Sequence, residues 1–246
     1  MRYFVELAYN GKNYHGWQIQ PNAISVQETL NKEFSQYFQE ELSLLGCGRT
    51  DAGVHASQFF AQFEIENEID LDLACYSLNN MIPKDISLKR IFPVAEDAHT
   101  RFSATARTYQ YFIHFNKDPF IGETSYRFYQ KLDVDAMNKA CETLFNYTDF
   151  TSFSKIHSEA KTNNCDLMRA DWKPFGTGIV FTIQADRFLR NMVRAIVGTM
   201  LDVGRGKLNV EEMKKIIELK DRSEAGTSVP AHALFLFKVD YPEDMV

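Results

Sequence analysis

The order in which strand-like and helix-like segments follow one another most constrains the fold of this chain. Residues 2–9 alternate apolar and polar side chains, as in a half-buried strand. A helix is predicted from Val26, because Ser25 and Glu28 form a capping box in front of apolar residues at helical spacing. The segments that follow are predicted as strands at 42–47, 57–65 and 86–94 and as a helix at 71–81. The first part of the chain therefore has the order βαββαβ.

The second part of the chain follows the same order without repeating the same residues. Strands are predicted at 107–115, 166–173, 179–185 and 234–241, and helices at 134–145, 188–201 and 210–219. Units of this order form the split βαβ, or ferredoxin-like, arrangement. The sequence therefore predicts an α+β protein with two tandem ferredoxin-like halves, 1–100 and 101–246. Together they are expected to form a mostly antiparallel sheet with helices packed on it.

Composition limits the class of protein. With 246 residues, 45% of them hydrophobic and 24% charged, the chain can bury a substantial core and is neither disordered nor fibrous. The longest apolar-rich segment, 188–201, is interrupted by Arg190 and Arg194 and is too short to span a bilayer, so we expect no membrane association. Four cysteines fit neither a zinc spacing nor a disulfide framework. Reduced thiols and a cytoplasmic location are therefore expected.

Charge is distributed unevenly along the chain. Residues 1–98 contain 7 basic and 14 acidic side chains, whereas residues 99–246 contain 20 basic and 19 acidic ones. Residues 155–215 hold 11 basic against 7 acidic side chains. A polyanion responds to the local potential and not to the net charge of −6, so a cationic groove on an acidic protein is compatible with nucleic-acid binding.

The segment GCGRTDAGVHA, residues 46–56, lies between two predicted strands and has two explanations. In the first, the segment is an ordinary turn, with Asp51 binding backbone amides and Arg49 in solvent. In the second, the turn orients the Asp51 carboxylate, which acts as nucleophile or general base. The chain lacks a Gly-Lys-Ser or Gly-Lys-Thr phosphate loop, a Gly-x-Ser-x-Gly elbow and a His-x-x-x-His pair. We therefore expect no nucleotide cofactor and no metal.

Three further clusters also have two explanations each. Tyr14 and Trp17 can stack on a base or pack on the core. The segment 99–113 alternates basic and aromatic residues, which suits either nucleic-acid contacts or an ordinary amphipathic strand. Arg187, Arg190 and Arg194 are predicted to share the polar side of helix 188–201, where they either contact phosphates or are simply solvated.

In their order along the chain and in their residues, these segments resemble the motifs of the TruA family of tRNA pseudouridine synthases. The matching strings are AYNGKNYHGWQ (8–18), SVQETL (25–30), GCGRTDAGVHA (46–56), RFSATARTYQY (101–111), FLRNMVRAIVG (188–198) and PAHALFL (230–236). They cover nearly the whole chain, and GRTDAGVHA is highly specific. The chain departs from the family at Asn10, where Asp is usual, and at Ala233, where Gly is usual. Neither position belongs to the implied catalytic set.

The resemblance implies roles for individual residues. The family's essential aspartate falls on Asp51, and the neighbouring arginine linked to displacing the target base falls on Arg49. The active-site tyrosine falls on Tyr109, the arginine that pairs with the catalytic carboxylate on Arg194, and a pocket-lining leucine on Leu234. Arg107, Arg187, Arg190 and lysines such as Lys155 and Lys161 would line a cationic cleft for RNA.

The activity implied by the resemblance is isomerisation of uridine to pseudouridine at positions 38, 39 and 40, in the anticodon stem-loop of tRNA. Asp51 would start cleavage of the N-glycosidic bond, after which the base rotates and rejoins the ribose through carbon. Because reactant and product are isomers, no cofactor is required. The family implies a homodimer. Asp51 either attacks the sugar or abstracts a ribose proton, and the sequence leaves this choice open.

Two other classes of protein compete with this interpretation. The first is a non-catalytic RNA-binding module of two ferredoxin-like halves, which would have no use for a carboxylate at Asp51. The second is a hydrolase or phosphotransferase with an aspartate nucleophile, acting on a small molecule. It would be insensitive to tRNA.

Overall fold

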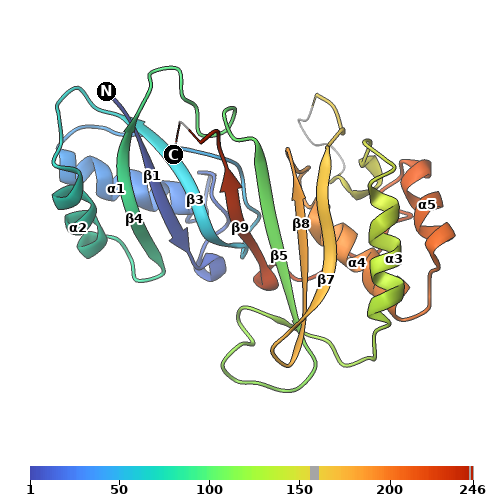
Figure 1. Cartoon of the computed structure of the whole chain (residues 1–246). Helices are drawn as coiled ribbons and strands as arrows, with labels where there is room; N and C mark the ends of the chain where they lie inside the picture. Colours follow the sequence, from blue (N-terminus) through green and yellow to red (C-terminus); the bar gives the residue numbers. More distant parts are fainter. Residues whose placement is uncertain (156–160, 244, 246) are drawn as a thin grey trace. The chain divides into compact units, whose positions relative to one another are not determined.

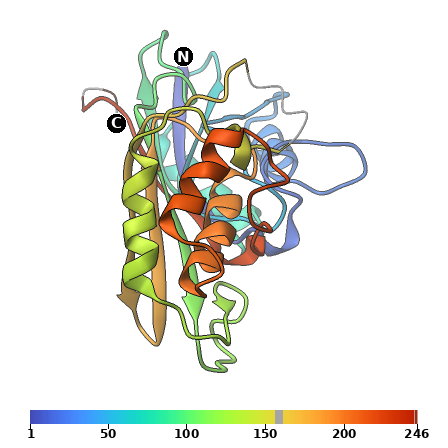
Figure 2. The ribbon, with the colours of Figure 1, turned by 90° about the vertical axis from the view of Figure 1, so that its right-hand side faces the viewer.

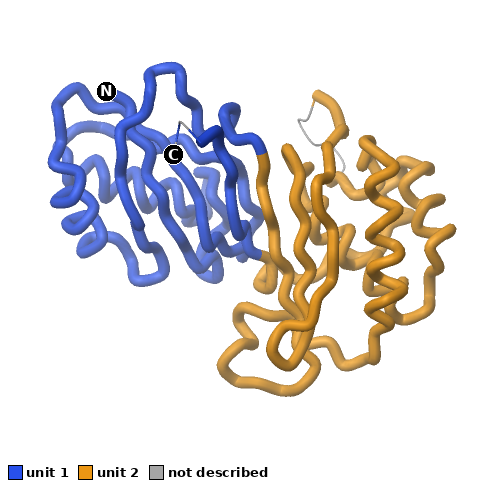
Figure 3. The backbone as a smooth tube through the Cα atoms, in the orientation of Figure 1, with its two compact units in different colours: residues 1–105, 235–246 blue, residues 106–234 orange. Residues whose placement is uncertain are grey.

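The computed structural model describes residues 1–155, 161–243 and 245, and its contacts divide the chain into two compact units. Unit 1 comprises residues 1–105 and 235–246, and unit 2 comprises residues 106–234 (Figure 3). Each unit contains antiparallel strands with helices packed on them, which confirms the predicted α+β class. The division into halves 1–100 and 101–246 stays a prediction.

Unit 1 follows the predicted order. Its elements are β1 (Arg2–Tyr9), α1 (Val26–Phe38), β2 (Leu45–Gly46), β3 (His55–Glu64), α2 (Leu71–Met81), β4 (Ile86–Val94) and most of β9 (Leu234–Asp240). β1 pairs antiparallel with β3 and with β4, and α1 and α2 contact each other beside this sheet (Figure 1). The order β4, β1, β3, β2 is therefore an antiparallel sheet with two crossover helices, as the βαββαβ pattern predicts.

Two strands share one edge of β3. β1 pairs along one edge of β3, and the other edge is divided between β2 and β9. β2 pairs antiparallel at Ala61 and Gln62, whereas β9 pairs parallel at His55 and Ala56. The loop 47–54 connects β2 to β3. The chain therefore places this loop directly before the part of β3 that β9 covers.

β2 is shorter than the strand predicted at 42–47. Leu42 and Leu44 are buried as predicted, but their backbone N–H groups donate to side chains of α1. The N–H of Leu42 donates to Ser35 Oγ at 2.8 Å, and that of Leu44 donates to Asn31 Oδ1 at 2.9 Å. These side-chain acceptors satisfy the two backbone N–H groups outside the sheet, and β2 begins only at Leu45.

Unit 2 has the elements predicted between residues 106 and 219 and one additional short strand, whereas the strand predicted at 234–241 is β9, most of which belongs to unit 1. Its elements are β5 (Ala106–His114), β6 (Tyr126–Arg127), α3 (Val134–Leu144), β7 (Leu167–Phe175), β8 (Gly178–Ala185), α4 (Met192–Gly204) and α5 (Val210–Leu219). β8 pairs antiparallel with β5 and β7. α3 packs against β7, α4 and α5, and the three helices face the viewer together in Figure 2.

α4 is the central helix of unit 2. All its residues are buried except Arg194 and Asp202, which are partly exposed. A helix that is apolar on every side is one that other elements surround. Arg194 is therefore an exception that packing alone does not explain. None of the helices among the described residues has the length and apolar content that crossing a membrane requires.

The predicted three-arginine helix face at 187, 190 and 194 is wrong. α4 begins at Met192, and Asn191 before it has φ 67° and ψ 0°, a left-handed conformation that interrupts a right-handed helix. Arg187 and Arg190 therefore lie on the segment between β8 and α4, and Arg194 alone lies on the helix. The apolar spacing of Phe188 and Leu189 imitates a helical period that the backbone does not follow.

Candidate active site

The predicted site residues are distributed over both units. Unit 1 holds Arg49 and Asp51, and unit 2 holds Arg107, Tyr109, Arg187, Arg190, Arg194 and Leu234.

Asp51 and Arg49 lie on the loop 47–54. The Asp51 side chain is partly exposed and that of Arg49 is exposed. The residue between them, Thr50, is buried, and its Oγ1 forms a hydrogen bond of 2.9 Å with the Tyr9 hydroxyl. The Asp51 carbonyl accepts the N–H of Val54 at 3.1 Å, which closes a tight turn. The loop is therefore fixed through buried backbone and Thr50, while its two charged side chains remain accessible.

The segment after β1 supports the loop from within unit 1. The N–H of Gly53 donates to the Tyr14 carbonyl at 3.2 Å. Gly16 has φ +88°, and a Cβ placed there would lie 2.2 Å from the Thr50 carbonyl oxygen. A side chain at this position would meet both backbone strain and a collision with backbone. The two segments therefore approach as closely as glycine permits.

The aromatic residues of this segment belong to the core. Trp17 is 1% exposed and stacks on Phe59, with ring centroids 4.2 Å apart. The buried Tyr14 donates its hydroxyl proton to Asp85 Oδ1 at 2.6 Å. Burial, and then the hydrogen bond and charge of Asp85, raise the pKa of Tyr14, so the hydroxyl stays protonated. Of the two explanations for these aromatics, the structure favours packing on the core.

β5 carries Arg107 and Tyr109 on one face, because side chains alternate along a strand. Both are partly exposed. The Tyr109 ring meets the Phe188 ring edge to face, with centroids 5.2 Å apart, and Arg107 Nη1 donates to the Asp186 carbonyl at 2.8 Å. The structure therefore brings these two predicted residues together with the segment that follows β8. The contact of Phe188 was not predicted from the sequence, which placed this residue on a helix.

Arg194 fixes the chain that leads to Leu234. Its Nε donates to the Val229 carbonyl at 2.7 Å, and the Val229 N–H donates to the Arg194 carbonyl at 3.2 Å. A Cβ at Gly198, one turn further along α4, would lie 1.9 Å from the Thr227 carbonyl oxygen. The segment before β9 is therefore pressed against α4. Leu234 begins β9 and is 5% exposed.

The two departures from the family pattern are accommodated by the backbone. Ala233 is buried in a 3₁₀ turn, Ala231–Ala233, a conformation that alanine adopts without strain. The Asn10 side-chain oxygen accepts the N–H of Lys12 at 3.0 Å and caps another 3₁₀ turn. An aspartate oxygen can make the same bond.

Arg187 and Arg190 lie close to the predicted lysines. Arg187 Nη1 is 3.5 Å from the carbonyl oxygen of Thr162, and the carbonyl of the exposed Arg190 accepts the N–H of Lys155 at 3.0 Å. The Lys155 and Lys161 side chains are exposed. The two segments that carry these four basic residues therefore lie next to each other, which is compatible with phosphate contacts.

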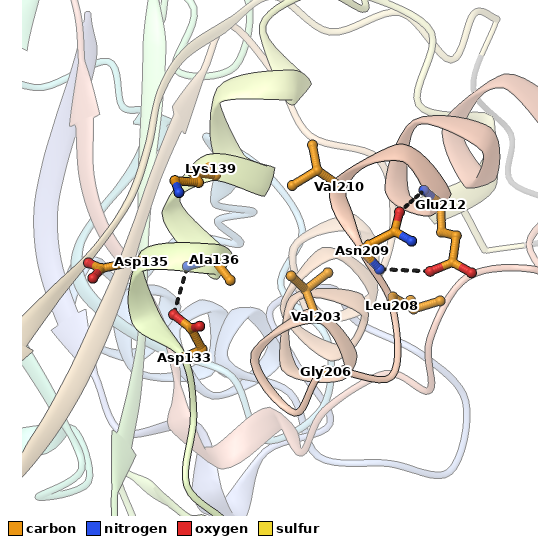
Figure 4. A pocket seen from close by; sticks show the side chains of 10 residues that line it. All are labelled: Asp133, Asp135, Ala136, Lys139, Val203, Gly206, Leu208, Asn209, Val210 and Glu212. Carbon is orange, nitrogen blue, oxygen red and sulfur yellow. Dashed lines mark hydrogen bonds between the residues drawn. The ribbon is translucent and has the colours of Figure 1, made fainter.

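A cavity of about 570 Å³ in unit 2 contains none of these residues (Figure 4). It lies where α3 and α5 begin and α4 ends. Asp133 Oδ1 accepts the Ala136 N–H, and Asn209 and Glu212 cap α5 reciprocally. Its three carboxylates, Asp133, Asp135 and Glu212, outnumber its one lysine, Lys139, so the lining has a net negative charge that disfavours RNA. Within the residues described, no group of three or more His, Cys, Asp or Glu could hold a metal ion.

Comparison with known proteins shows to which family the chain is related. The sequence profile of a family described as tRNA pseudouridine synthase matches residues 140–242. A protein of Bacteroides thetaiotaomicron is 55% identical over 247 residues, with 99% of this chain and 92% of the relative covered, and one of Parabacteroides distasonis is 53% identical over 245 residues, with 99% and 97% covered. A protein of Caldicellulosiruptor bescii is 40% identical over 239 residues, with 96% and 98% covered. All three are named tRNA pseudouridine synthase A.

The α+β fold, the aspartate loop and these relatives define an isomerase of the pseudouridine synthase class. Sequence identity of 53–55% over nearly the full length of both chains shows membership of the same family. The chain belongs to the TruA family of tRNA pseudouridine synthases.

The close approach at Gly16 predicts a large difference between two glycine substitutions. Gly16→Ala should lower the free energy of unfolding by at least about 2 kcal/mol, because alanine would be strained at positive φ and would collide with Thr50. Gly48→Ala on the loop itself has open space around the new methyl group, so we expect a change within about 0.5 kcal/mol. Urea unfolding of both variants measures the difference. Equal stabilities would contradict the tight support of the loop.

Proposed function

We propose that this chain converts uridine to pseudouridine in the anticodon stem-loop of tRNA, at positions 38, 39 and 40. The observation that carries the proposal is the loop of Asp51, a partly exposed carboxylate on a backbone fixed by Thr50 and by the turn closed at Val54. The relatives named tRNA pseudouridine synthase A support the substrate and the reaction.

The reaction exchanges one bond of the nucleoside for another. The bond from ribose C1′ to uracil N1 breaks, the base turns while bound, and C1′ joins C5. The proton at C5 leaves and N1 gains a proton, so reactant and product have the same composition. No oxidant, reductant or nucleotide is needed.

Asp51 starts the reaction, either by attacking the sugar or by abstracting a ribose proton. Arg194 is proposed to keep this carboxylate ionised and aimed. Two observations in unit 2 support the role of Arg194. It interrupts an otherwise apolar part of α4, and the bond from its Nε to Val229 fixes the direction of its side chain. An arginine held in this way loses little entropy when it binds a carboxylate.

Tyr109, Leu234 and Arg49 are proposed to handle the target base. Tyr109 stacks on uracil or relays a proton, and its contact with Phe188 fixes the orientation of its ring. Leu234 excludes water from the reacting base. Arg49, exposed and close to Asp51 in sequence, fills the gap that the flipped nucleotide leaves, which offsets an unstacking cost of a few kcal/mol.

RNA is proposed to bind through phosphate contacts. A-form RNA is recognised by shape and backbone, because its deep groove is too narrow for side chains. Arg107, Arg187 and Arg190, with exposed lysines such as Lys155 and Lys161, supply the positive charges. We also propose that the enzyme is a homodimer and acts in the cytoplasm.

Asp51→Asn tests the catalytic assignment. The substitution keeps size and polarity but removes the nucleophile or base, so release of tritium from 5-tritiated uridine in tRNA should fall at least about 1000-fold. Binding of tRNA should be retained, and circular dichroism checks the fold. A folded variant with the wild-type rate would exclude Asp51 as the catalytic residue. Phosphate or hydrolysis products from wild-type enzyme would instead favour a hydrolase.

Arg190→Ala tests the proposed phosphate contacts. Loss of one contact should weaken binding about equally for different tRNAs and reduce the slope of log Kd against log salt by about 1. Arg169→Ala is the matched control, because Arg169 is also an exposed arginine but lies on β7, outside the proposed phosphate contacts. Filter binding at several salt concentrations measures both. A slope unchanged in Arg190→Ala would remove this residue from the RNA interface.

Sedimentation equilibrium tests the proposed homodimer. The free enzyme should have twice the 28.4 kDa mass of the chain at micromolar concentration. A single species of 28.4 kDa would show that a monomer is the resting form.

A further inference from the structure

His55 directly follows the Asp51 loop and is the first residue of β3. Its side chain is 1% exposed, and its Nδ1 lies 3.0 Å from the backbone nitrogen of Gly11. A backbone N–H can only donate, so Nδ1 is the acceptor and carries no proton. The imidazole is therefore neutral, with its proton on Nε2.

The partner of this hydrogen bond has no room to move towards the loop. Gly11 is buried, and a Cβ placed on it would lie 2.0 Å from the carbonyl oxygen of Val54, the residue before His55. The backbone at Gly11 thus touches the last residue of the loop and donates to the first residue of the strand. Without His55 the buried N–H of Gly11 would lose this acceptor.

Besides Gly11, His55 contacts strand β9. The His55 ring stacks on Phe235, with centroids 4.6 Å apart and an angle of 28° between the planes. The two residues are also partners in the parallel pairing of β3 with β9 (Figure 1). His55 therefore connects three segments that are distant in sequence: the turn after β1, the end of the Asp51 loop, and the start of β9.

We propose that His55 is a positioning residue for the reaction: its neutral imidazole, held between Gly11 and Phe235, fixes the end of the loop and with it the direction of the Asp51 carboxylate. This inference rests on the proposed role of Asp51. Ala52, Gly53 and Val54 separate the two residues, and Gly53 has φ +77°, a conformation that glycine leaves easily. A loop end released at His55 would let the carboxylate shift, and a misplacement of about 1 Å can cost about 100-fold in rate.

Two substitutions at His55 separate positioning from general packing. His55→Leu fills the buried position with an apolar side chain but removes the acceptor for the N–H of Gly11. His55→Asn places an amide oxygen near the position of Nδ1 and so retains an acceptor. His114→Leu is the matched control, because His114 is 3% exposed and its Nδ1 forms a 2.9 Å hydrogen bond with Ser125 Oγ in unit 2.

We expect His55→Leu to lower kcat for tRNA about 10- to 100-fold with KM changed less than about threefold, because binding does not depend on the direction of Asp51. His55→Asn should recover most of this kcat. His114→Leu should lower the melting temperature but keep the wild-type kcat. All rates are measured at a temperature where every variant is folded.

Three outcomes would overturn the positioning role: wild-type kcat in His55→Leu, an equal loss of kcat in His114→Leu, or no recovery in His55→Asn. Nitrogen NMR of the wild-type imidazole gives a direct readout, and a protonated Nδ1 would also overturn it. Asp51→Asn distinguishes the two proposals. If Asp51→Asn is active, the proposed function fails; if it is inactive while His55→Leu is fully active, the function stands and the role of His55 fails.

Discussion

The close contact between two backbone segments of unit 1 is the constraint on which the candidate site depends. The segment after β1 lies against the Asp51 loop at Gly11 and Gly16, where any side chain would collide with a carbonyl oxygen of the loop. Backbone contacts of this kind do not adapt as side chains do, because there is no rotamer to change. These contacts, together with the bond between Thr50 and Tyr9, fix the backbone of the loop against the segment after β1. Tyr14 adds two hydrogen bonds to this arrangement: its hydroxyl donates to Asp85, and its carbonyl accepts the N–H of Gly53 in the loop.

The same principle operates in unit 2 around α4. The segment before Leu234 is pressed against the helix at Gly198 and bonded to Arg194 in both directions, through its side chain and its backbone. An arginine in such a helix is costly to bury, and its bond to the Val229 carbonyl offsets part of that cost. Arg194 thus has a structural role, holding the segment before Leu234, in addition to its proposed catalytic role. A substitution of Arg194 would disturb the path to Leu234 together with any charge interaction, so loss of activity in such a variant would not by itself identify the role of the guanidinium.

Much of the fold was predictable because local signals agree with the tertiary structure. Helices α1, α2 and α5 begin where Ser25, Asp70 and Asn209 accept backbone N–H groups, and these caps are visible in the sequence. The start of α4 was not predictable, because apolar residues before Asn191 continue the helical spacing while the backbone turns left-handed. The contact of His55 with Gly11 joins residues distant in sequence, and no periodicity reports such a pair. For Asp51, composition alone favours a plain turn over a catalytic loop; the catalytic interpretation rests on the resemblance of the whole string.

Net charge is a poor guide to the partner of this protein because the charges are segregated. The acidic excess lies in residues 1–98, whereas neighbouring segments of unit 2 carry the exposed Arg190, Lys155 and Lys161 and the partly exposed Arg187. At physiological salt the field of an exposed charge is largely screened beyond about 8 Å, so an RNA phosphate near these side chains responds little to carboxylates farther away. If RNA binds through these few cations, as proposed, its affinity is separable from catalysis. The proposed phosphate contacts come from side chains at the surface, whereas the loop of Asp51 is fixed by buried backbone, so the salt dependence of binding and the rate of the chemical step should depend on different parts of the molecule.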